Sequence, residues 1–276
     1  MVRGVLRVCA VAGVIALSVA TLLLASGCGS DLSADVDPEQ VDAVARPDSG
    51  ACRVLEPADI EAPSDATRTV SCSKRHTAET YAVGELPDEL DDAAYDSRKV
   101  ALAGYRACNE AFARHLGADE SVVMRTVLSW AWFRPSEKAW EKGARWYRCD
   151  LVGGTEAVAK DRFLALPQKT RNLLRTSKPA DRWMVCGRGP SVSTSTKVPC
   201  NRPHDWRAAT TIKVGEPSES YPGDRVIEVK TREYCRNSIS AWLNYAVDFQ
   251  FGYTWFHEAE WDAGNRRSIC WARTDK

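Results

Sequence analysis

Apolar positions recur every fourth residue from Val100 to Leu116, which is the spacing of one face of an α-helix. Gly117 follows directly and stands where a helix of this kind ends. A second helix is predicted after residues 222–224, again with a cysteine, Cys235, on its apolar side. Each half of the chain is therefore expected to contain one main helix.

Short extended segments surround both predicted helices. Apolar and polar residues alternate from Trp206 to Val214, a pattern typical of a half-buried strand. Further strands are predicted around residues 52, 69–72 and 79–83, over 122–133, and over the closing segments 144–152 and 266–273. The helix of the first half is expected to start near residues 91–92. This order of strands and helices predicts an α+β fold with a mainly antiparallel sheet in each half.

Eight cysteines divide into two sets of four with matching surroundings. Both halves contain a C-x3-H segment, which ends at His76 in the first half and at His204 in the second. Both also contain a W-x2-G-x5-C segment, which starts at Trp140 and at Trp261. Such internal similarity indicates two copies of one unit. We therefore expect two tandem domains braced by cysteines, at residues 51–153 and 181–276.

The first 28 residues have the features of an export signal. Arg3 and Arg7 precede an apolar run over residues 8–24, which is short for a membrane span. Small residues then lead to Cys28, an order that resembles the signal of bacterial lipoproteins. This resemblance implies cleavage after residue 27 and a lipid on Cys28. An ordinary secretory signal and an uncleaved anchor are the alternatives.

The number of cysteines agrees with export. Of ten cysteines, Cys9 would leave with the signal and Cys28 would carry the lipid, so an even number remains. Many pairings are possible for eight cysteines, but the repeat favours bridges that stay within each half. We expect the early strands to be joined in each half, and the helix to be joined to the last strand. The expected disulfides are Cys52–Cys72, Cys108–Cys149, Cys186–Cys200 and Cys235–Cys270.

Charge and composition argue against nucleic-acid binding and indicate the character of two further segments. Basic and acidic residues both number 37, so the chain lacks the positive surplus typical of nucleic-acid binding. Residues 28–50 are rich in aspartate and poor in large apolar side chains, which predicts a flexible acidic stalk. Residues 154–180 contain leucines among basic residues and are expected to form a connector packed on a domain.

The two C-x3-H segments, the helix cysteine and the W-x2-G-x5-C ending together resemble the septum-formation domain family, in two tandem copies. Members are exported and often lipid-anchored proteins of actinobacteria. The resemblance extends over residues 51–153 and 181–276, and is strongest in the second copy, where Pro203 precedes His204. In the first copy Arg75 takes that place. The resemblance implies a link to division-septum formation and brings no catalytic residues with it.

The histidines and tryptophans are the candidate binding residues. His76 and His204 could supply half of a Cys/His zinc site, but oxidised cysteines are not ligands, and a hydrogen bond within the turn is the simpler role. No cofactor or metal is expected. Trp140 and Trp261 could stack on wall sugars or could pack in the core. The sequence contains no known catalytic motif, and the H-E-x-x-H pattern is incomplete at His257.

These features predict a non-enzymatic protein of the cell envelope that acts by binding. It would be attached by lipid to the outer face of the cytoplasmic membrane and connected with septum formation or cell division. Envelope proteins, division proteins or peptidoglycan would be its partners, and nucleic acid would not. The alternatives are a wall-glycan binding module that uses the tryptophans, and a metal-dependent or hydrolytic enzyme built around His76 and His204.

Overall fold

The computed structural model describes residues 35–154, 162–216 and 218–274. Residues 35–276 form one compact unit. The expected signal peptide and the expected lipidation site at Cys28 lie outside the described residues. Within the described ranges, none of the helices combines the length and the apolar character that crossing a membrane requires.

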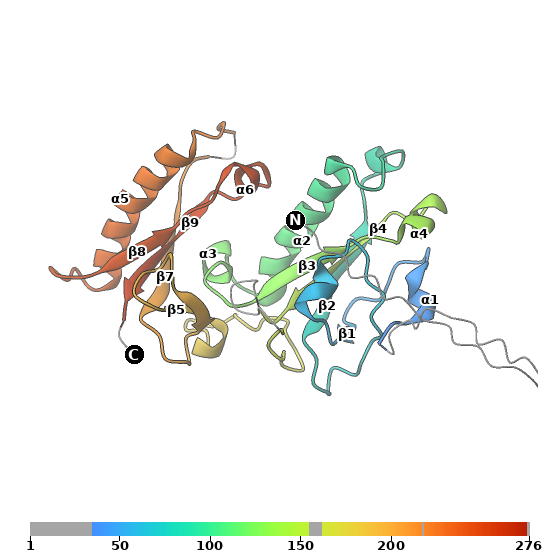
Figure 1. Ribbon diagram of the computed structural model, residues 1–276, viewed down its shortest axis with the longest axis horizontal. Helices are drawn as coiled ribbons and strands as arrows, with labels where there is room; N and C mark the ends of the chain where they lie inside the picture. Colours follow the sequence, from blue (N-terminus) through green and yellow to red (C-terminus); the bar gives the residue numbers. More distant parts are fainter. Residues whose placement is uncertain (1–34, 155–161, 217, 275–276) are drawn as a thin grey trace, which may run out of the picture. The chain divides into compact units, whose positions relative to one another are not determined.

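The first copy consists of a four-stranded antiparallel sheet and a long helix (Figure 1). The strands run in the order β1-β2-β4-β3 across the sheet. Their bounds are Cys52–Arg53 for β1, Ala78–Glu85 for β2, Ser129–Phe133 for β3 and Trp146–Val152 for β4. The helix, α2, spans Arg98–Leu116 and packs against β2, β3 and β4.

The second copy has a five-stranded antiparallel sheet in the order β6-β5-β7-β9-β8, with its own long helix, α5 (Asp224–Trp242). The strand bounds are Val185–Arg188 for β5, Thr196–Pro199 for β6, Trp206–Lys213 for β7, Phe251–Thr254 for β8 and Arg267–Arg273 for β9. Two antiparallel sheets, each with a main helix, give the expected α+β fold.

Short helices complete both copies. The α-helical ones are α1 (Pro38–Val41), α3 (Glu120–Val123), α4 (Glu137–Glu141) and α6 (Glu258–Asp262). The 3-10 turns are η1 (Pro57–Ile60), η2 (Asp88–Leu90) and η3 (Asp181–Trp183). Because α4 and α6 both precede the closing strand of their copy, the repeat extends to these small elements.

The ends of α2 follow from its sequence. The backbone N–H of Val100 donates to the hydroxyl of Ser97 at 3.4 Å, which caps the first turn. Gly117 ends the helix with a φ of 70°, a left-handed conformation that costs glycine little.

The expected start of this helix near residues 91–92 is wrong, because η2 and a turn occupy that segment. Residues 122–123, the start of the expected strand, are helical instead, because they belong to α3, which Asp119 caps by accepting from the N–H of Val122 at 2.8 Å.

Four disulfides join the same four pairs that the repeat predicted. Cys52–Cys72 and Cys186–Cys200 tie early segments together, with Cα separations of 5.3 and 4.9 Å. Cys108–Cys149 and Cys235–Cys270 connect the main helix to the closing strand, with Cα separations of 5.5 and 5.1 Å. These separations suit unstrained bridges. The helix of each copy is therefore fixed covalently to the middle of its sheet.

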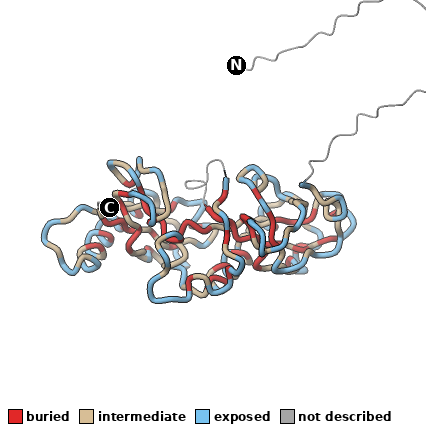
Figure 2. The backbone as a smooth tube through the Cα atoms, turned by 90° about the horizontal axis from the view of Figure 1, so that it is seen from below, coloured by how far each residue is buried: buried red, intermediate tan, exposed pale blue. Residues whose placement is uncertain are grey.

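The two copies share one core. The backbone N–H of Val127 donates to Trp183 O at 2.9 Å, and that of Val185 donates to Arg125 O at 2.8 Å. One cluster of buried side chains includes Leu128 from the first copy and Trp271 from the second. Figure 2 shows buried backbone running through both copies. Leu166 and Leu174, which lie between the copies in sequence, are buried in the same cluster, and the domain limits given above remain a prediction.

The segment before the first copy differs from its expected character. Residues 35–50, part of the predicted flexible stalk, lie on the first copy rather than free of it. The N–H of Asp37 donates to Ala66 O at 2.8 Å, and the hydroxyl of Ser136 donates to Asp42 at 2.7 Å. Composition missed this packing because polar partners, not apolar burial, hold the segment in place.

Candidate functional site

His76 and His204 occupy the same environment in the two copies. His76 Nδ1 lies 2.8 Å from Lys74 O, and His204 Nδ1 lies 2.7 Å from Arg202 O. A carbonyl only accepts, so Nδ1 carries the ring proton in both and donates it. Nε2 of each ring is buried without a partner among the described residues. Both histidines therefore hold the turn before a strand, which is the simpler of the two expected roles.

A potential metal site around His76 is incomplete. Ligand atoms of Cys52, His76 and Glu79 lie within 4.8 Å of one another. However, Cys52 is bonded to Cys72, and a disulfide sulfur offers no thiolate. The two remaining ligands are fewer than a structural zinc site requires. In the second copy Arg207 stands three residues after His204, where Glu79 stands after His76, so the acidic ligand is not repeated.

Glu79 takes part in a buried polar chain instead. The hydroxyl of Thr170 donates to Glu79 Oε2 at 2.7 Å and lies 2.7 Å from His115 Nε2. Burial, and next the positive charge of Arg171, lower the pKa of His115 to about 4. His115 is therefore neutral near pH 7. Because Thr170 belongs to the connector, this chain fastens the connector to the first copy.

Trp140 and Trp261 are core residues. Trp140 is 6 % exposed and Trp261 is 4 % exposed, so neither indole offers a face to a sugar from solvent. The guanidinium of Arg145 lies 4.0 Å from the ring centroid of Trp140, and that of Arg266 lies 3.6 Å from the ring centroid of Trp261. Both arginines also donate to the carbonyl of their tryptophan, at 2.8 and 2.6 Å. The candidate binding role of these two tryptophans is not supported by their burial.

The arginines extend the repeated motif. Arg145 and Arg266 both stand two residues after the glycine of the W-x2-G-x5-C segment, so the full pattern is W-x2-G-x-R-x3-C. The matching positions of the two arginines are visible in the sequence, because they stand at the same spacing in both halves. In each copy the arginine of this motif contacts its tryptophan and so links the short helix to the start of the last strand.

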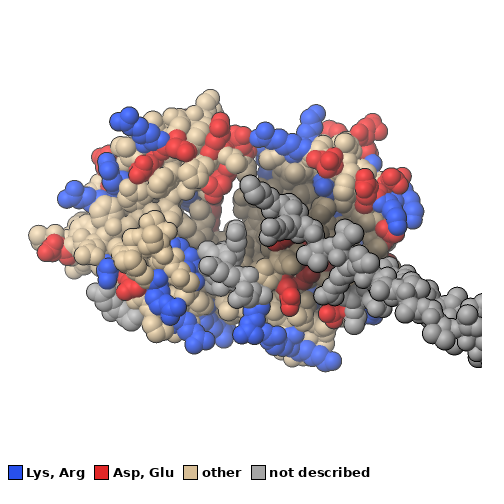
Figure 3. Space-filling view, in the orientation of Figure 1, with Lys and Arg blue, Asp and Glu red and all other residues tan. Residues whose placement is uncertain are grey.

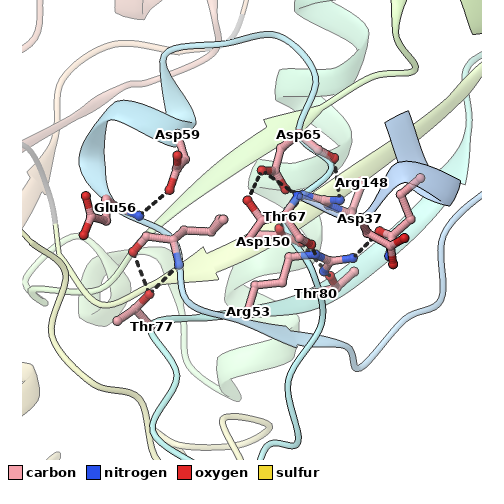
Figure 4. A network of polar contacts seen from close by, with 12 residues as sticks. Asp37, Arg53, Glu56, Asp59, Asp65, Thr67, Thr77, Thr80, Arg148 and Asp150 are labelled. Atoms are coloured by element: carbon pink, nitrogen blue, oxygen red, sulfur yellow. Dashed lines mark hydrogen bonds and ion pairs between the residues drawn. The ribbon is translucent and has the colours of Figure 1, made fainter. Parts of the chain in front are cut away.

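A buried charged network lies on the face of the first sheet opposite α2 (Figure 4). Arg148 on β4 forms ion pairs with Asp65 at 2.5 Å and with Asp150 at 2.9 Å. Arg53 Nη1 donates to the hydroxyl of Thr80 at 2.8 Å, which in turn donates to Asp150 at 2.7 Å. Two arginines and two aspartates therefore balance one another. Burial, and next the nearby Arg148, lower the pKa of Arg53.

A hollow of about 650 Å³ adjoins this network. Its wall includes Gln40 from the N-terminal segment, the Cys52–Cys72 disulfide and the side chains of Trp146 and Arg148. Trp146 Nε1 is a buried donor that has no partner within the described residues. The Cys52–Cys72 disulfide thus borders the hollow beside the buried charge network.

Comparison with known families identifies the repeated unit. A family model described as septum formation matches residues 21–134 and 49–270. The chain belongs to the septum formation family. The two matched regions overlap and together extend over most of the chain, in agreement with tandem copies. No curated protein and no solved structure matches this septum-formation protein.

The charged network of this septum-formation protein was not predicted from its sequence, although a signal existed. Arg148 and Asp150 flank Cys149, whereas Ile269 and Trp271 flank Cys270 at the matching positions. On a strand, residues on either side of an inward cysteine point to the opposite face. That face is thus charged in one copy and apolar in the other. The two copies share a scaffold and have diverged on this face.

Proposed function

We propose that this septum-formation protein is a lipid-anchored protein of the cell envelope that acts by binding during cell division. The lipid on Cys28 would hold it at the outer face of the cytoplasmic membrane. Its partners would be other envelope or division proteins. Membership of the septum formation family supports the link to division. The location outside the cytoplasm, the lipid anchor and the action by binding are proposed in addition.

The four disulfides support a location outside the cytoplasm. They stay within the copies and join eight cysteines without remainder among the residues after Cys28. Disulfides of this kind persist outside the reducing cytoplasm. The apolar run and the small residues before Cys28 support export and lipidation by the same reasoning as above. A single short acyl anchor binds weakly, whereas two or more chains hold a protein stably at a membrane.

The histidines favour binding over catalysis. A nucleophile and its base must lie within hydrogen-bond reach of each other. His76 Nε2 and His204 Nε2 have no such neighbour among the described residues, and every cysteine there is oxidised. The buried state of Trp140 and Trp261 gives no support to a glycan-stacking role for them. Protein partners are therefore favoured over wall sugars.

Microscopy combined with fractionation tests the proposal. A fluorescent tag on the C-terminus of the full chain should accumulate at septa, and deletion of the gene should alter septum placement or timing. The variant Cys28→Ala should leave the membrane fraction, whereas the control Cys9→Ala should remain in it. Even distribution along the cell with normal division after deletion would contradict the septal role. Unchanged membrane retention of Cys28→Ala would contradict lipid anchoring.

A further inference from the structure

A second pocket lies where the two copies meet, away from the charged network of the first sheet. It has a volume of about 710 Å³, within the range of small-molecule sites. The first copy contributes Val122 and Arg125, and the second contributes His204, Arg207 and Trp242. His204 belongs to the C-x3-H segment, so the pocket is built directly on the family motif of the second copy.

The wall of this pocket carries a surplus of positive charge. Four basic residues line it, Arg125, Lys178, Arg207 and Arg273, against the single carboxylate of Asp181 in the lining, and Arg273 forms an ion pair with Asp205 at 3.8 Å. Arg207 forms an ion pair with Asp181 at 2.6 Å. Lys and Arg side chains gather along the lower edge of the molecule in Figure 3.

Among these basic residues, Arg125 has the guanidinium best oriented to bind an anion. Its Nε and Nη1 donate to Ser121 O and Ala209 O, at 2.9 and 2.6 Å, which fixes the guanidinium plane. No carboxylate of the described residues lies within ion-pair distance of it, because every ion pair found there involves other residues. Burial lowers its pKa; the charge of Asp119 acts in the opposite direction, and the smaller effect of Arg207 lowers the pKa further. A partly buried, preoriented guanidinium without an ion-pair partner is suited to bind an anion.

Apolar side chains also line the pocket. Trp242 at the end of α5 lines it and is 43 % exposed, which is unusual among the tryptophans of this chain. Leu243 and Met184 are further apolar residues of the lining. An exposed indole and guanidinium groups that line the same pocket offer stacking and charge to one ligand at the same time.

From this arrangement we infer that the pocket binds a small organic anion. A carboxylate or phosphate group of the ligand contacts the guanidinium groups of Arg125 and Arg207, and its apolar body packs on Trp242. The inference extends beyond the proposed role in division, because it assigns a ligand class to a site that the role does not require. It is independent of lipid anchoring and of the septal location.

Isothermal titration calorimetry of the purified full chain, with its disulfides intact, tests this inference. Phenyl phosphate and benzoate are the probes, while inorganic phosphate and benzyl alcohol supply the anion and the apolar body separately. At least one of the two aromatic anions should bind more tightly than either part alone. A preference between benzoate and phenyl phosphate then distinguishes a carboxylate ligand from a phosphate ligand. Affinity should fall as salt is raised, since exposed charges are screened.

Variants locate the site. Arg125→Gln should weaken binding of the preferred anion about tenfold, as expected for loss of a charged hydrogen-bond donor. Trp242→Ala should weaken it about fivefold through loss of aromatic contact. Tyr234→Ala is the matched control, because Tyr234 is also on α5 and is 45 % exposed but does not line the pocket.

Three results would overturn the inference. These are no binding of either aromatic anion at millimolar concentration, equal binding of inorganic phosphate or benzyl alcohol, and binding that survives both Arg125→Gln and Trp242→Ala. Circular dichroism melting shows whether Arg125→Gln is folded. Because Trp242 is on the surface, the Trp242→Ala variant keeps the test decisive even if Arg125→Gln unfolds.

Discussion

Arg148 and Asp150 form an ion pair on one strand although both side chains are excluded from water. The pair joins Arg148 Nη2 and Asp150 Oδ2 at 2.9 Å, and their side chains are 1 % and 0 % exposed. Two residues apart on β4, they point to the same face of the sheet. The second copy folds with apolar residues at these positions, so the shared scaffold does not depend on this charge pair.

Removal of one partner should be costly. Asp150→Ala leaves the positive charge of Arg148 under-compensated in the interior, and we expect the free energy of unfolding to fall by about 3–5 kcal/mol. The double variant Arg148→Met with Asp150→Leu removes both charges and should lose less than Asp150→Ala alone. Urea unfolding of the three proteins measures this difference.

An exposed pair provides the control for that experiment. Arg114 and Glu110 form an ion pair at 2.6 Å on the surface of α2, with side chains 66 % and 74 % exposed. Surface pairs contribute little, so Glu110→Ala should change stability only slightly. A double variant less stable than Asp150→Ala would show that the network stabilises the sheet through its specific geometry.

His115 should make the fold sensitive to acid. Its pKa is lowered to about 4 in the folded protein, mainly by burial, against 6.5 in an unfolded chain. Between these values the unfolded state binds the proton and the folded state does not, so stability is present above pH 6.5 and falls as the pH drops toward 4. Urea unfolding at pH 7 and pH 4.5 should show this loss, and His115→Gln should reduce it.

The exposed His257 is the control for this measurement. A hydrogen bond to Asp224 raises the pKa of His257, so its contribution has the opposite sign and is lost as the pH rises. His257→Gln should therefore leave the acid-induced loss of stability in place. If His115→Gln and wild type lost the same stability between pH 7 and pH 4.5, the burial of a neutral His115 would not be the cause.

Close packing between α2 and β3 should make Gly104 irreplaceable. A Cβ at this position would lie 2.4 Å from the indole of Trp132, closer than real contacts allow. Alanine normally favours a helix over glycine by about 1 kcal/mol, yet we expect Gly104→Ala to lower stability by about 1–3 kcal/mol through overpacking. Adding Trp132→Leu should recover part of the loss. An increase in thermal stability for Gly104→Ala alone would contradict this packing.

Much of the scaffold could be predicted because it is encoded locally and twice. The four-residue apolar spacing of α2 and the alternation along β7 indicate which face of each element is buried. The cysteine pairs followed from the repeat, since each copy closes on itself. Residues 35–50 and 122–123 were predicted incorrectly, because polar contacts to Asp42 and a helix cap at Asp119 outweigh composition.

The polar sites were less predictable because their members come from distant segments. Asp65 reaches Arg148 across 83 residues, and Thr170 reaches Glu79 across 91. Neither pairing leaves a periodic signal in the sequence. The anion pocket likewise needs Arg125 and Trp242 from different copies, and only their folded arrangement brings them together.

The four disulfides should differ in their resistance to reduction. Cys72 is partly exposed and borders the first hollow, whereas the cysteines of the other three bridges are at most 5 % exposed. Thiol–disulfide exchange requires access of the attacking thiolate to a sulfur atom. Mild treatment of the native protein with a dithiol, followed by alkylation and peptide mapping, should therefore label Cys52 and Cys72 first. Cys235 and Cys270 should stay unlabelled until the protein is unfolded. Simultaneous labelling of all eight residues would mean that the native fold does not protect the buried bridges.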